Sequence, residues 1–521
     1  MKLQIFDSTL RDGAQGANIS FSVEDKLKVI RTLDDLGVDF IEAGNPFSNP
    51  AEMQFFQRIA GLKLAHAKIV AFGSTRRKGI LPAEDGNLKS LLAAGTEYVA
   101  IFGKSHIRHA TDVLKATPEE NLAMIGESVR FLTEKGKKVV FDAEHFFDGY
   151  KTDAEYAMRA LESAAQAGAV TLCLCDTNGG IFPDEARAIT EKVVQKFPQL
   201  TVAIHCHNDG DLAVANSIAA VDAGARQVQG TLLGFGERCG NVNLCSVICN
   251  LQLKRGYECI PPDHLKEMYG CAMALAETAN AAIPPNQPYV GMNAFAHKAG
   301  MHADGVLKYS SSFEHVDPEA IGNKRKFLLS EISGKSAIYD KLKNYFPSLD
   351  KNGKEMGEIV SALKDRALAG YQYEAAEASF VLLVEKILGK YKNSFDLISY
   401  KIISEQPAIE GKVASAIVKI RVNGATKIAA ADGEGPVHAM DLALRAALSD
   451  FYPEIARMSL VDFKVRVLDS DKATAAKVRV LITSADSADS WTTVGVSEDV
   501  IEASWIALTD SIDYALMRRE R

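Results

Sequence analysis

The sequence predicts an α/β protein: a (β/α)8 barrel of the TIM type, followed by mainly helical linker subdomains and a C-terminal α+β domain. Short apolar runs alternate with longer amphipathic stretches from Leu3 to about Leu253. Eight such strand–helix units over roughly 250 residues match the size and rhythm of a barrel. An open doubly wound sheet is the structural alternative. Polar residues after the predicted strands favour the barrel, because its active site gathers at the C-terminal ends of the strands.

The predicted barrel strands are short runs rich in β-branched and other apolar residues. They are Leu3–Asp7, Phe40–Ala43, Lys68–Ala71, Tyr98–Phe102, Val139–Ala143, Thr171–Cys175, Val202–Cys206 and Gln227–Thr231. Three of the intervening helices begin after a serine or threonine, whose hydroxyl caps free backbone N–H groups, and the first ends at a glycine. They are Val23–Leu36 (after Ser22, closed by Gly37), Pro118–Lys135 (after Thr117) and Asp153–Ala167 (after Thr152).

The regular alternation of strand and helix patterns ends after the predicted barrel. Pro261-Pro262 and Ile283–Pro288 mark breaks, and the residues from about 260 to 385 are predicted to be mainly helical. A third region then shows alternating strand patterns and two helices, which suggest a pseudo-repeated α+β module. Its predicted elements are the strands Ala414–Val422, Leu460–Leu468 and Lys477–Thr483 and the helices Pro436–Phe451 and Ser497–Met517. The predicted domains are therefore 1–260, 261–390 and 391–521.

The composition is that of an ordinary globular protein. Of 521 residues, 47% are hydrophobic and 24% are charged, and the net charge is -8. This modest negative charge gives no reason to expect nucleic acid or an anionic membrane as a partner. No apolar run is long enough to cross a bilayer, and the N-terminus shows no signal-peptide pattern. The eight cysteines are scattered, which favours free thiols in a reducing cytoplasm over a disulfide framework.

His205 and His207 carry the strongest functional signal. They lie at the end of a predicted strand, in Val202-Ala-Ile-His-Cys-His-Asn-Asp209. Residues two apart on a strand point to the same face, so both imidazoles aim at one point. Imidazole is the commonest side-chain metal ligand. An isolated pair of this kind is more often two histidines at a loop edge whose hydrogen bonds are satisfied, so other segments of the chain have to show whether this pair binds a metal.

Other polar segments follow other predicted strands and converge on the same face of the barrel. They are Asp7–Gly13, Asp142–His145, Asp176–Gly180 and the glycine-rich loop Gly234–Asn243. Carboxylates, two imidazoles, an arginine and an amide thus surround one cavity. A divalent metal explains this crowding, because unpaired buried charges would be costly. The loop lacks the lysine and serine or threonine of a P-loop, and Cys173 and Cys175 fit one buried strand face rather than a zinc site.

The elements TLRDG, HCHND and GERCGN together resemble the metal-dependent Claisen-condensing barrels: the isopropylmalate, homocitrate and citramalate synthase family. The resemblance covers essentially the whole chain. Four stretches are similar to the citramalate branch rather than to the leucine-pathway branch: Ala71–Arg77, Ile101–Lys104, Asp142–Tyr150 and Cys175–Gly180. The resemblance implies condensation of pyruvate with acetyl-CoA and water to citramalate and CoA. The alternative within the family is an isopropylmalate synthase that uses 2-ketoisovalerate.

The family's metal ligands correspond to Asp12, His205, His207 and Asn241. Two nitrogens and two oxygens suit Zn2+, Mn2+, Co2+ or Mg2+, so the ligand set does not select the ion. Asp12 alone also fits an Asx-turn before Gly13, and Asn241 alone fits a loop amide. All four at the expected strand ends make coincidence improbable.

The resemblance also implies the catalytic and substrate-binding residues. Arg11 is expected near the oxygen where negative charge develops, or in a salt bridge to Glu42 or Glu144. Glu144 and His302 are nominated as the acid and base, with His302 reaching the active site of a neighbouring subunit. Thr177 corresponds to the residue that binds the keto-acid carboxylate. His297 and Tyr309 are weaker candidates that a structural role would also explain.

The family uses its C-terminal module to bind an amino-acid end product, which for the citramalate branch is isoleucine. In this chain, Gly433–Ala439 is predicted to form a strand-to-helix turn whose helix N-terminus can receive a carboxylate. A dimerisation module without ligand is the alternative. The resemblance further implies a homodimer built through the C-terminal half.

Two functions of other classes are alternatives to a condensing enzyme. A retro-aldol lyase or carboxyltransferase on a related barrel has no need of a module that senses an end product. A non-catalytic amino-acid sensor would have lost site residues. None of the six is missing: Arg11, Asp12, Glu144, His205, His207 and Asn241.

Overall fold

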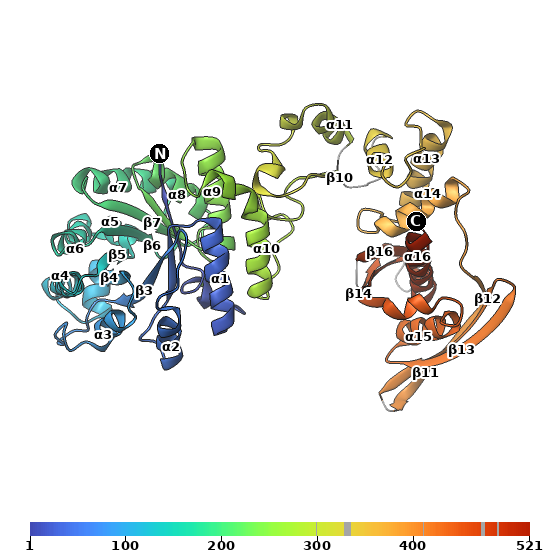
Figure 1. Ribbon diagram of the computed structural model, residues 1–521, viewed down its shortest axis with the longest axis horizontal. Helices are drawn as coiled ribbons and strands as arrows, with labels where there is room; N and C mark the ends of the chain where they lie inside the picture. The colour runs from blue at the N-terminus through green and yellow to red at the C-terminus, as the bar shows by residue number, and fades with distance from the viewer. Residues whose placement is uncertain (299, 328–334, 410, 470–474, 487–488, 521) are drawn as a thin grey trace. The chain divides into compact units, whose positions relative to one another are not determined.

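The chain forms two compact units (Figure 1). The computed structural model describes residues 1–298, 300–327, 335–409, 411–469, 475–486 and 489–520. The first unit comprises Met1–Phe295 and His315–Arg325, and the second comprises Ala296–Glu314 and Lys326–Arg521. The domain boundaries predicted near residues 260 and 390 stay a prediction.

Eight parallel strands close into a barrel in the order of the sequence. The barrel closes because β1 pairs with β8, with Phe6 opposite Gln229. The predicted barrel is therefore confirmed, and the open sheet is excluded. The strands are β1 (Gln4–Asp7), β2 (Phe40–Gly44), β3 (Lys68–Ser74), β4 (Tyr98–Lys104), β5 (Lys138–Glu144), β6 (Thr171–Asp176), β7 (Thr201–Cys206) and β8 (Gln227–Gly230).

Helices follow the strands around the barrel (Figure 1). In α1, the Ser22 hydroxyl accepts from the Asp25 N–H in a capping box, and Gly37 ends the helix in the left-handed region at φ 92°. Both predicted boundaries of this helix are confirmed. The helices are α1 (Val23–Leu36), α2 (Pro50–Ile59), α3 (Gly86–Ala93), α4 (Pro118–Glu134), α5 (Phe146–Thr152), α6 (Ala154–Gln166), α7 (Pro183–Lys196), α8 (Ala213–Asp222), α9 (Leu244–Arg255) and α10 (Met268–Thr278).

One predicted helix start is wrong. Thr152 is the last residue of α5, and the N-cap of α6 is Asp153, whose carboxylate accepts from the Tyr156 N–H. Threonine and aspartate are both good N-caps, so composition alone did not decide between them. The Thr152 hydroxyl instead donates to the Asp148 carbonyl inside the preceding turn, which keeps Thr152 helical.

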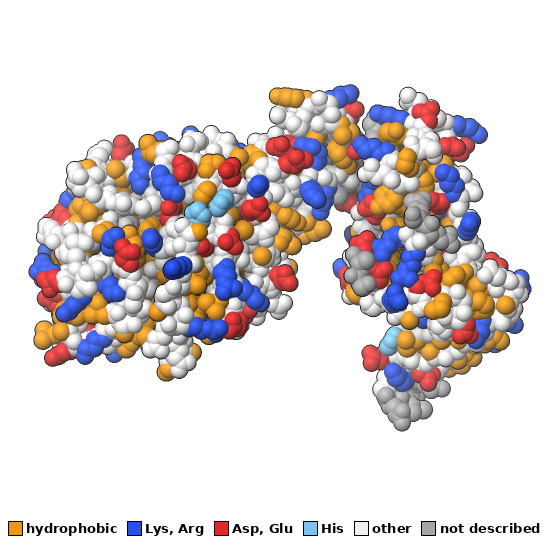
Figure 2. All heavy atoms as spheres, in the orientation of Figure 1, with side chains coloured by type: hydrophobic (Ala, Val, Ile, Leu, Met, Phe, Trp, Pro, Cys, Tyr) orange, Lys and Arg blue, Asp and Glu red, His pale blue; other side chains and the backbone are white. Residues whose placement is uncertain are grey.

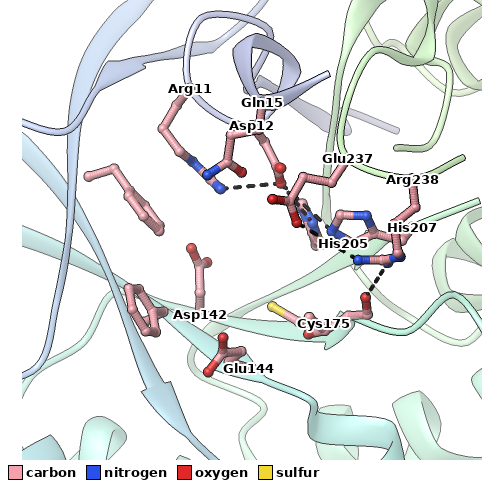
Figure 3. A pocket seen from close by; sticks show the side chains of 13 residues that line it. Arg11, Asp12, Gln15, Asp142, Glu144, Cys175, His205, His207, Glu237 and Arg238 are labelled. Carbon is pink, nitrogen blue, oxygen red and sulfur yellow. Dashed lines mark hydrogen bonds and ion pairs between the residues drawn. The ribbon is translucent and has the colours of Figure 1, made fainter. Parts of the chain in front are cut away.

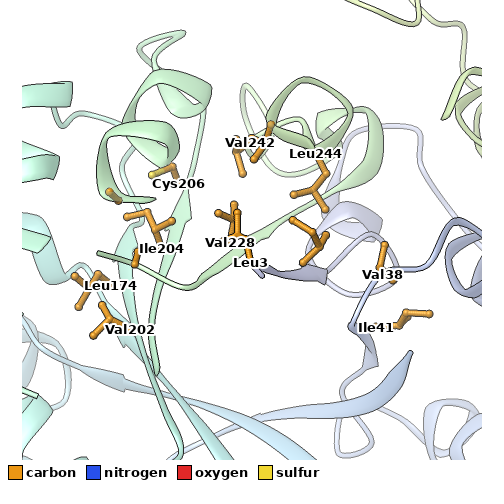
Figure 4. Packing of buried hydrophobic residues seen from close by; sticks show 14 of the residues in the cluster. Leu3, Val38, Ile41, Leu174, Val202, Ile204, Cys206, Val228, Val242 and Leu244 are labelled. Carbon is orange, nitrogen blue, oxygen red and sulfur yellow. The ribbon is translucent and has the colours of Figure 1, made fainter. Parts of the chain in front are cut away.

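The core of the first unit lies between the barrel strands and the surrounding helices. Figure 4 shows part of it, where Leu174, Val202 and Ile204 from neighbouring strands pack together. All three are at most 2% exposed. Burying each of these side chains contributes about 1.5–3 kcal/mol. This core holds the strand ends, and with them the polar side chains that follow, in fixed positions.

Short 3-10 and π-helical segments connect the helices and strands of both units. Among them, the π-helix η2 (His109–Val113) follows β4. The others are 3-10 turns: η1 (Gly13–Gln15), η3 (Leu232–Gly234), η4 (Pro262–Glu267), η5 (Ser310–Ser312), η6 (Pro318–Ile321) and η7 (Pro453–Arg457).

The second unit begins with the short strand β9, continues mainly with helices and ends in two similar β-β-β-α motifs, which confirms the predicted pseudo-repeat. Three predicted strands and two helices appear, and β11, β13 and β16 were not predicted. The elements are β9 (Ala296–His297), α11 (Gly300–Lys308), β10 (Lys326–Phe327), α12 (Lys335–Leu342), α13 (Lys354–Leu368), α14 (Glu377–Ile387), β11 (Asp396–Ile409), β12 (Lys412–Val422), β13 (Ala425–Gly433), α15 (Pro436–Leu448), β14 (Ser459–Val467), β15 (Val478–Ala485), β16 (Ser490–Ser497) and α16 (Val500–Glu520).

Charged side chains of both signs are interspersed over the visible face of each unit (Figure 2). All eight cysteines are free, and six of them are buried, which agrees with the expected absence of a disulfide framework. Among the described residues, none of the helices combines the length and apolar character needed to span a bilayer.

Candidate active site

A cavity of about 260 Å³ lies at the C-terminal end of the barrel (Figure 3). The ends of β1, β3, β4, β5, β6 and β7 and the loop after β8 each contribute side chains to its wall, as the barrel geometry predicts. The lining residues are Arg11, Asp12, Gln15, Phe72, Phe102, Asp142, Glu144, Cys175, Thr177, His205, His207, Glu237 and Arg238.

Three predicted metal ligands meet in this cavity. The Asp12 carboxylate lies 3.4 Å from His205 Nε2 and 3.9 Å from His207 Nε2. The three side chains are at most 7% exposed, and their ligand atoms lie within 4.8 Å of one another. His205 is the last but one residue of β7 and lies opposite Cys175 of β6. The predicted convergence of the two imidazoles is therefore seen, and Asp12 joins them from the loop after β1.

Asn241 is brought to the same place by the loop after β8. A backbone bridge pairs Asn241 with His207. The Asn241 amide nitrogen donates to the Phe235 carbonyl at 3.2 Å, which leaves its Oδ1 as the free acceptor. The turn needs glycine at 236, because φ there is +156° and a Cβ would lie 2.3 Å from Asn241 Nδ2. The glycine-rich loop thus serves to position the amide.

The donor set fits a divalent cation. Asn241 Oδ1 is buried without a hydrogen-bond partner among the described residues, and the Nε2 atoms of His205 and His207 face the Asp12 carboxylate. Unsatisfied buried polar atoms are uncommon and point to an ion or water. Burial lowers the pKa of His207 to about 4, so its imidazole is neutral at neutral pH, as metal binding requires. Although burial opposes it, the charge of Arg11 keeps the pKa of Asp12 well below its ordinary value.

Arg11 is held beside this cluster. Its Nε donates to the buried Glu42 carboxylate at 2.6 Å, and its Nη1 lies 3.2 Å from Asp12. The guanidinium also lies over the Phe72 ring, 3.9 Å from the centroid. The sequence offered Glu42 or Glu144 as the salt-bridge partner of Arg11, and in the structure the partner is Glu42. Burial acts to lower the pKa of Arg11, but the surrounding carboxylates raise it above its ordinary value.

Asp142, which begins the predicted polar segment Asp142–His145, forms a buried polar pair with Gln229, which the sequence did not single out. Gln229 Nε2 donates to Asp142 Oδ1 at 3.1 Å. Burial and the nearby Glu42 charge raise the pKa of Asp142 to about 7. Asp142 also lies near Cys173 and Cys175. Burial raises the pKa of Cys173 well above its ordinary value, which disfavours the thiolate that a metal would need.

Glu144 is the last residue of β5, and its carboxylate is part of the cavity wall (Figure 3). Its side chain is 23% exposed and forms an ion pair with Lys104 of β4. Thr177 lies on the loop after β6, where its hydroxyl accepts from the His145 N–H at 2.8 Å. The backbone that carries Glu144 is thereby tied to the predicted carboxylate-binding residue.

Arg238 is a cavity residue that the sequence did not single out individually. Its guanidinium donates to both oxygens of Asp209, at 2.8 and 2.9 Å, and to the Thr177 carbonyl at 2.8 Å. Arg238 therefore links the loops after β6, β7 and β8 at the mouth of the cavity. The sequence pointed to Arg238 only through its place in the segment GERCGN.

The remaining predicted site residues belong to the second unit. His302 is exposed on α11 and stacks on Phe313, with ring centroids 4.2 Å apart. Its catalytic role stays a prediction. His297 is buried and hydrogen-bonded to Glu314 at 2.9 Å, and Tyr309 is 68% exposed. Ala299, in the segment that suggested His302, lies outside the described residues.

A second cavity, of about 390 Å³, lies in the C-terminal module. The helix α15 and the strand β14 supply most of its wall. The predicted turn before α15 is present: the helix begins at Pro436, after the extended N-cap Gly435. Binding of a carboxylate there stays a prediction. The lining residues are Val437, His438, Asp441, Leu442, Arg445, Met458, Ser459, Leu460 and Phe463.

Three family models match successive parts of the chain. The HMGL-like model matches residues 2–270, the homocitrate synthase post-HMGL domain-like model matches residues 289–370, and the LeuA allosteric (dimerisation) domain model matches residues 374–516. These matches follow the order barrel, helical segment and C-terminal module.

Curated relatives match over nearly the whole length. An (R)-citramalate synthase of Aquifex aeolicus is 48% identical over 520 residues, which cover 100% of this chain and 98% of that protein. An (R)-citramalate synthase of Sulfolobus acidocaldarius is 44% identical, covering 99% of this chain and 97% of that protein. A 2-isopropylmalate synthase of Methanocaldococcus jannaschii is 31% identical, covering 100% of this chain and 96% of that protein.

Proposed function

Because this chain belongs to the (R)-citramalate synthase family, we propose that it condenses pyruvate with acetyl-CoA and water to give citramalate and CoA. The observation that carries the proposal is the buried Asp12, His205 and His207 cluster beside Arg11, in a cavity whose wall also contains Glu144. These are the groups that a Claisen condensation on a 2-keto acid requires: a cation site, a base and a stabiliser of developing charge.

Asp12, His205, His207 and Asn241 would hold the divalent cation, which is Mn2+, Zn2+, Co2+ or Mg2+ in this proposal. When bound, the cation polarises the keto-acid carbonyl as a Lewis acid. Thr177 is placed in the wall to donate its hydroxyl hydrogen to the pyruvate carboxylate, since that oxygen already accepts from the His145 N–H. Pyruvate is thereby oriented before the chemical step.

Glu144 accepts a methyl proton of acetyl-CoA in this mechanism. The resulting carbanion attacks C2 of pyruvate, and the C=O electron pair moves onto oxygen, where the Arg11 guanidinium stabilises the new charge. Protonation of that oxygen gives the citramalyl thioester. Water then cleaves the thioester and releases CoA. His302, from a second copy of the chain, is the proposed proton donor to the alkoxide.

Thiol release from acetyl-CoA by the purified protein with a divalent metal tests the function. Pyruvate, 2-ketoisovalerate and 2-ketoglutarate are offered separately. Release with pyruvate well above that with the other two supports the proposal. Preference for 2-ketoisovalerate would show an isopropylmalate synthase, and no release with any keto acid would refute the condensing activity.

The keto-acid side chain is expected to face an aromatic wall. Phe72 and Phe102 are stacked, with ring centroids 5.6 Å apart, and both line the cavity. Phe102→Ala is therefore expected to raise kcat/KM for 2-ketoisovalerate relative to pyruvate at least ~10-fold, because one to two methylenes discriminate by that amount. Steady-state kinetics with both keto acids measure it. Phe182→Ala, at an exposed site (59%), is the control, and an unchanged ratio in Phe102→Ala would exclude this wall from selectivity.

The C-terminal module is proposed to bind isoleucine as an inhibitor, and the chain is proposed to act as a homodimer. The match to the LeuA allosteric (dimerisation) domain supports both. Leu442→Trp, which fills part of the 390 Å³ cavity, is expected to raise the inhibitory isoleucine concentration at least ~10-fold, a loss of about 1.4 kcal/mol. Inhibition curves of thiol release measure it.

The exposed Leu81 (64%) provides the size-matched control, Leu81→Trp. Unaltered inhibition in Leu442→Trp would place the effector elsewhere. A point variant is preferable to removal of the residues after 390, because Phe380 and Val381 of α14 share one core with Val494 of β16 and Leu508 of α16. A truncation would expose that core.

A further inference from the structure

Lys104 and Glu144 form an ion pair at the wall of the active-site cavity. They lie opposite each other in the register of β4 and β5, at the last position of both strands. Lys104 Nζ contacts Glu144 Oε2, and the two side chains are only 17% and 23% exposed. Glu144 lines the cavity, whereas Lys104 is not among its described lining residues. Lys104 therefore meets the cavity through the side chains that it contacts, of which Glu144 is the charged one and Phe102, with its ring centroid 5.5 Å from Lys104 Nζ, is the apolar one.

The backbone around this pair is fixed by hydrogen bonds. The Ser105 hydroxyl donates to the Glu144 carbonyl at 2.7 Å. Asn121 donates to the Lys104 carbonyl and to the Tyr156 hydroxyl, both at 2.8 Å. Since both strand ends are held, the ion pair with Lys104 orients the Glu144 carboxylate. The carboxylate oxygen Oε2 contacts Lys104, and the Glu144 side chain also lines the cavity.

We propose that Lys104 is a positioning residue for the condensation: it holds Glu144 as a carboxylate and directs its second oxygen toward the methyl group of acetyl-CoA. The inference rests on the proposed function. A partly buried carboxylate without a cation would take up a proton more readily. A smaller fraction of Glu144 would then be present as the carboxylate that can accept the methyl proton, while the pyruvate site around Arg11 and Thr177 would be unaltered.

Other titratable groups interact with this pair, and their effects on the reaction have to be distinguished from the effect of Lys104. His109, in η2 after β4, interacts with both Lys104 and Glu144, and Cys175 of β6 interacts with Glu144. The His109 ring contacts those of His106 and His145, with centroids 4.8 and 4.3 Å away. Burial, followed by the neighbouring His145, lowers the pKa of His109, which favours its neutral form.

Lys104→Met tests the inference, because it keeps the length of the side chain and removes the charge. The expected result is a kcat at least ~10-fold lower with the pyruvate KM within about threefold. The acidic limb of the kcat–pH profile should move up by about one pH unit, because the carboxyl loses the cation that favours its charged form. Lys104→Arg should restore most of the rate and the original limb. Lys104→Gln replaces the methionine variant if thermal unfolding shows that the latter does not fold.

The chain offers a matched control at the other end of the same two strands. Lys138, the first residue of β5, pairs with Glu97 at 2.7 Å, and both side chains are about half exposed. Lys138→Met should leave kcat and the pH profile unchanged, and so should His109→Gln. A folded Lys104→Met with wild-type kcat and profile would overturn the inference. A rate loss that arginine does not rescue and that leaves the acidic limb in place would also overturn it. Absence of thiol release in the wild type would instead refute the proposed function.

Discussion

Asp12→Ala is expected to lose the bound metal and the activity together, with thiol release at least ~100-fold lower. The variant removes the only carboxylate of the Asp12, His205 and His207 cluster. It also removes one of the two carboxylates that pair with Arg11, at 3.2 Å. Metal analysis of the purified protein and thiol release from acetyl-CoA with pyruvate measure the two effects on the same sample.

Asp35→Ala is the matched control, because Asp35 is an exposed aspartate on α1. It should keep metal content and activity. If Asp12→Ala retained its metal, the ligand assignment would be wrong, whatever happened to the rate. Loss of metal with unaltered turnover would show that the cation is structural rather than part of the reaction.

Glu144→Gln is expected to lower kcat by about 10²–10⁴-fold while metal content and pyruvate binding persist. Glutamine keeps the size of the side chain but cannot accept the proton. The backbone should stay in place, because the Ser105 hydroxyl bonds to the carbonyl of residue 144 and not to its side chain. Steady-state kinetics, metal analysis and a pyruvate binding titration test this prediction.

Glu134→Gln, at an exposed position on α4, controls for the loss of one negative charge. Turnover in Glu144→Gln close to that of the wild type would remove Glu144 from the mechanism. Loss of pyruvate binding would show that Glu144 binds substrate instead of acting as a base. Lys104→Met and Glu144→Gln together also separate the base from the group that positions it, because Lys104→Met is expected to shift the acidic limb of the pH profile and Glu144→Gln to remove it.

Much of the first unit could be predicted from local sequence. The helix Val23–Leu36 was predicted to the residue, because Ser22 and Gly37 determine its ends through hydrogen bonds and backbone conformation within one turn. The eight strands were found within a few residues, because their apolar runs are bounded by polar or glycine-rich segments. The α5–α6 boundary was missed where Thr152 and Asp153 compete for the same cap.

The sequence by itself indicated several of the groups that reach the cavity. His205 and His207 share a face because they are two apart on a strand, and Asp12, Glu144 and Thr177 lie at or just after strand ends, which converge in any closed parallel barrel. Only the tertiary structure decided which of these groups touch one another. Arg11 pairs with Glu42, Arg238 with Asp209, and Lys104 with Glu144, across 31, 29 and 40 positions of the chain. Those pairs depend on the register between strands and on the path of the loops after them, which the packing of the whole barrel sets and no local pattern encodes.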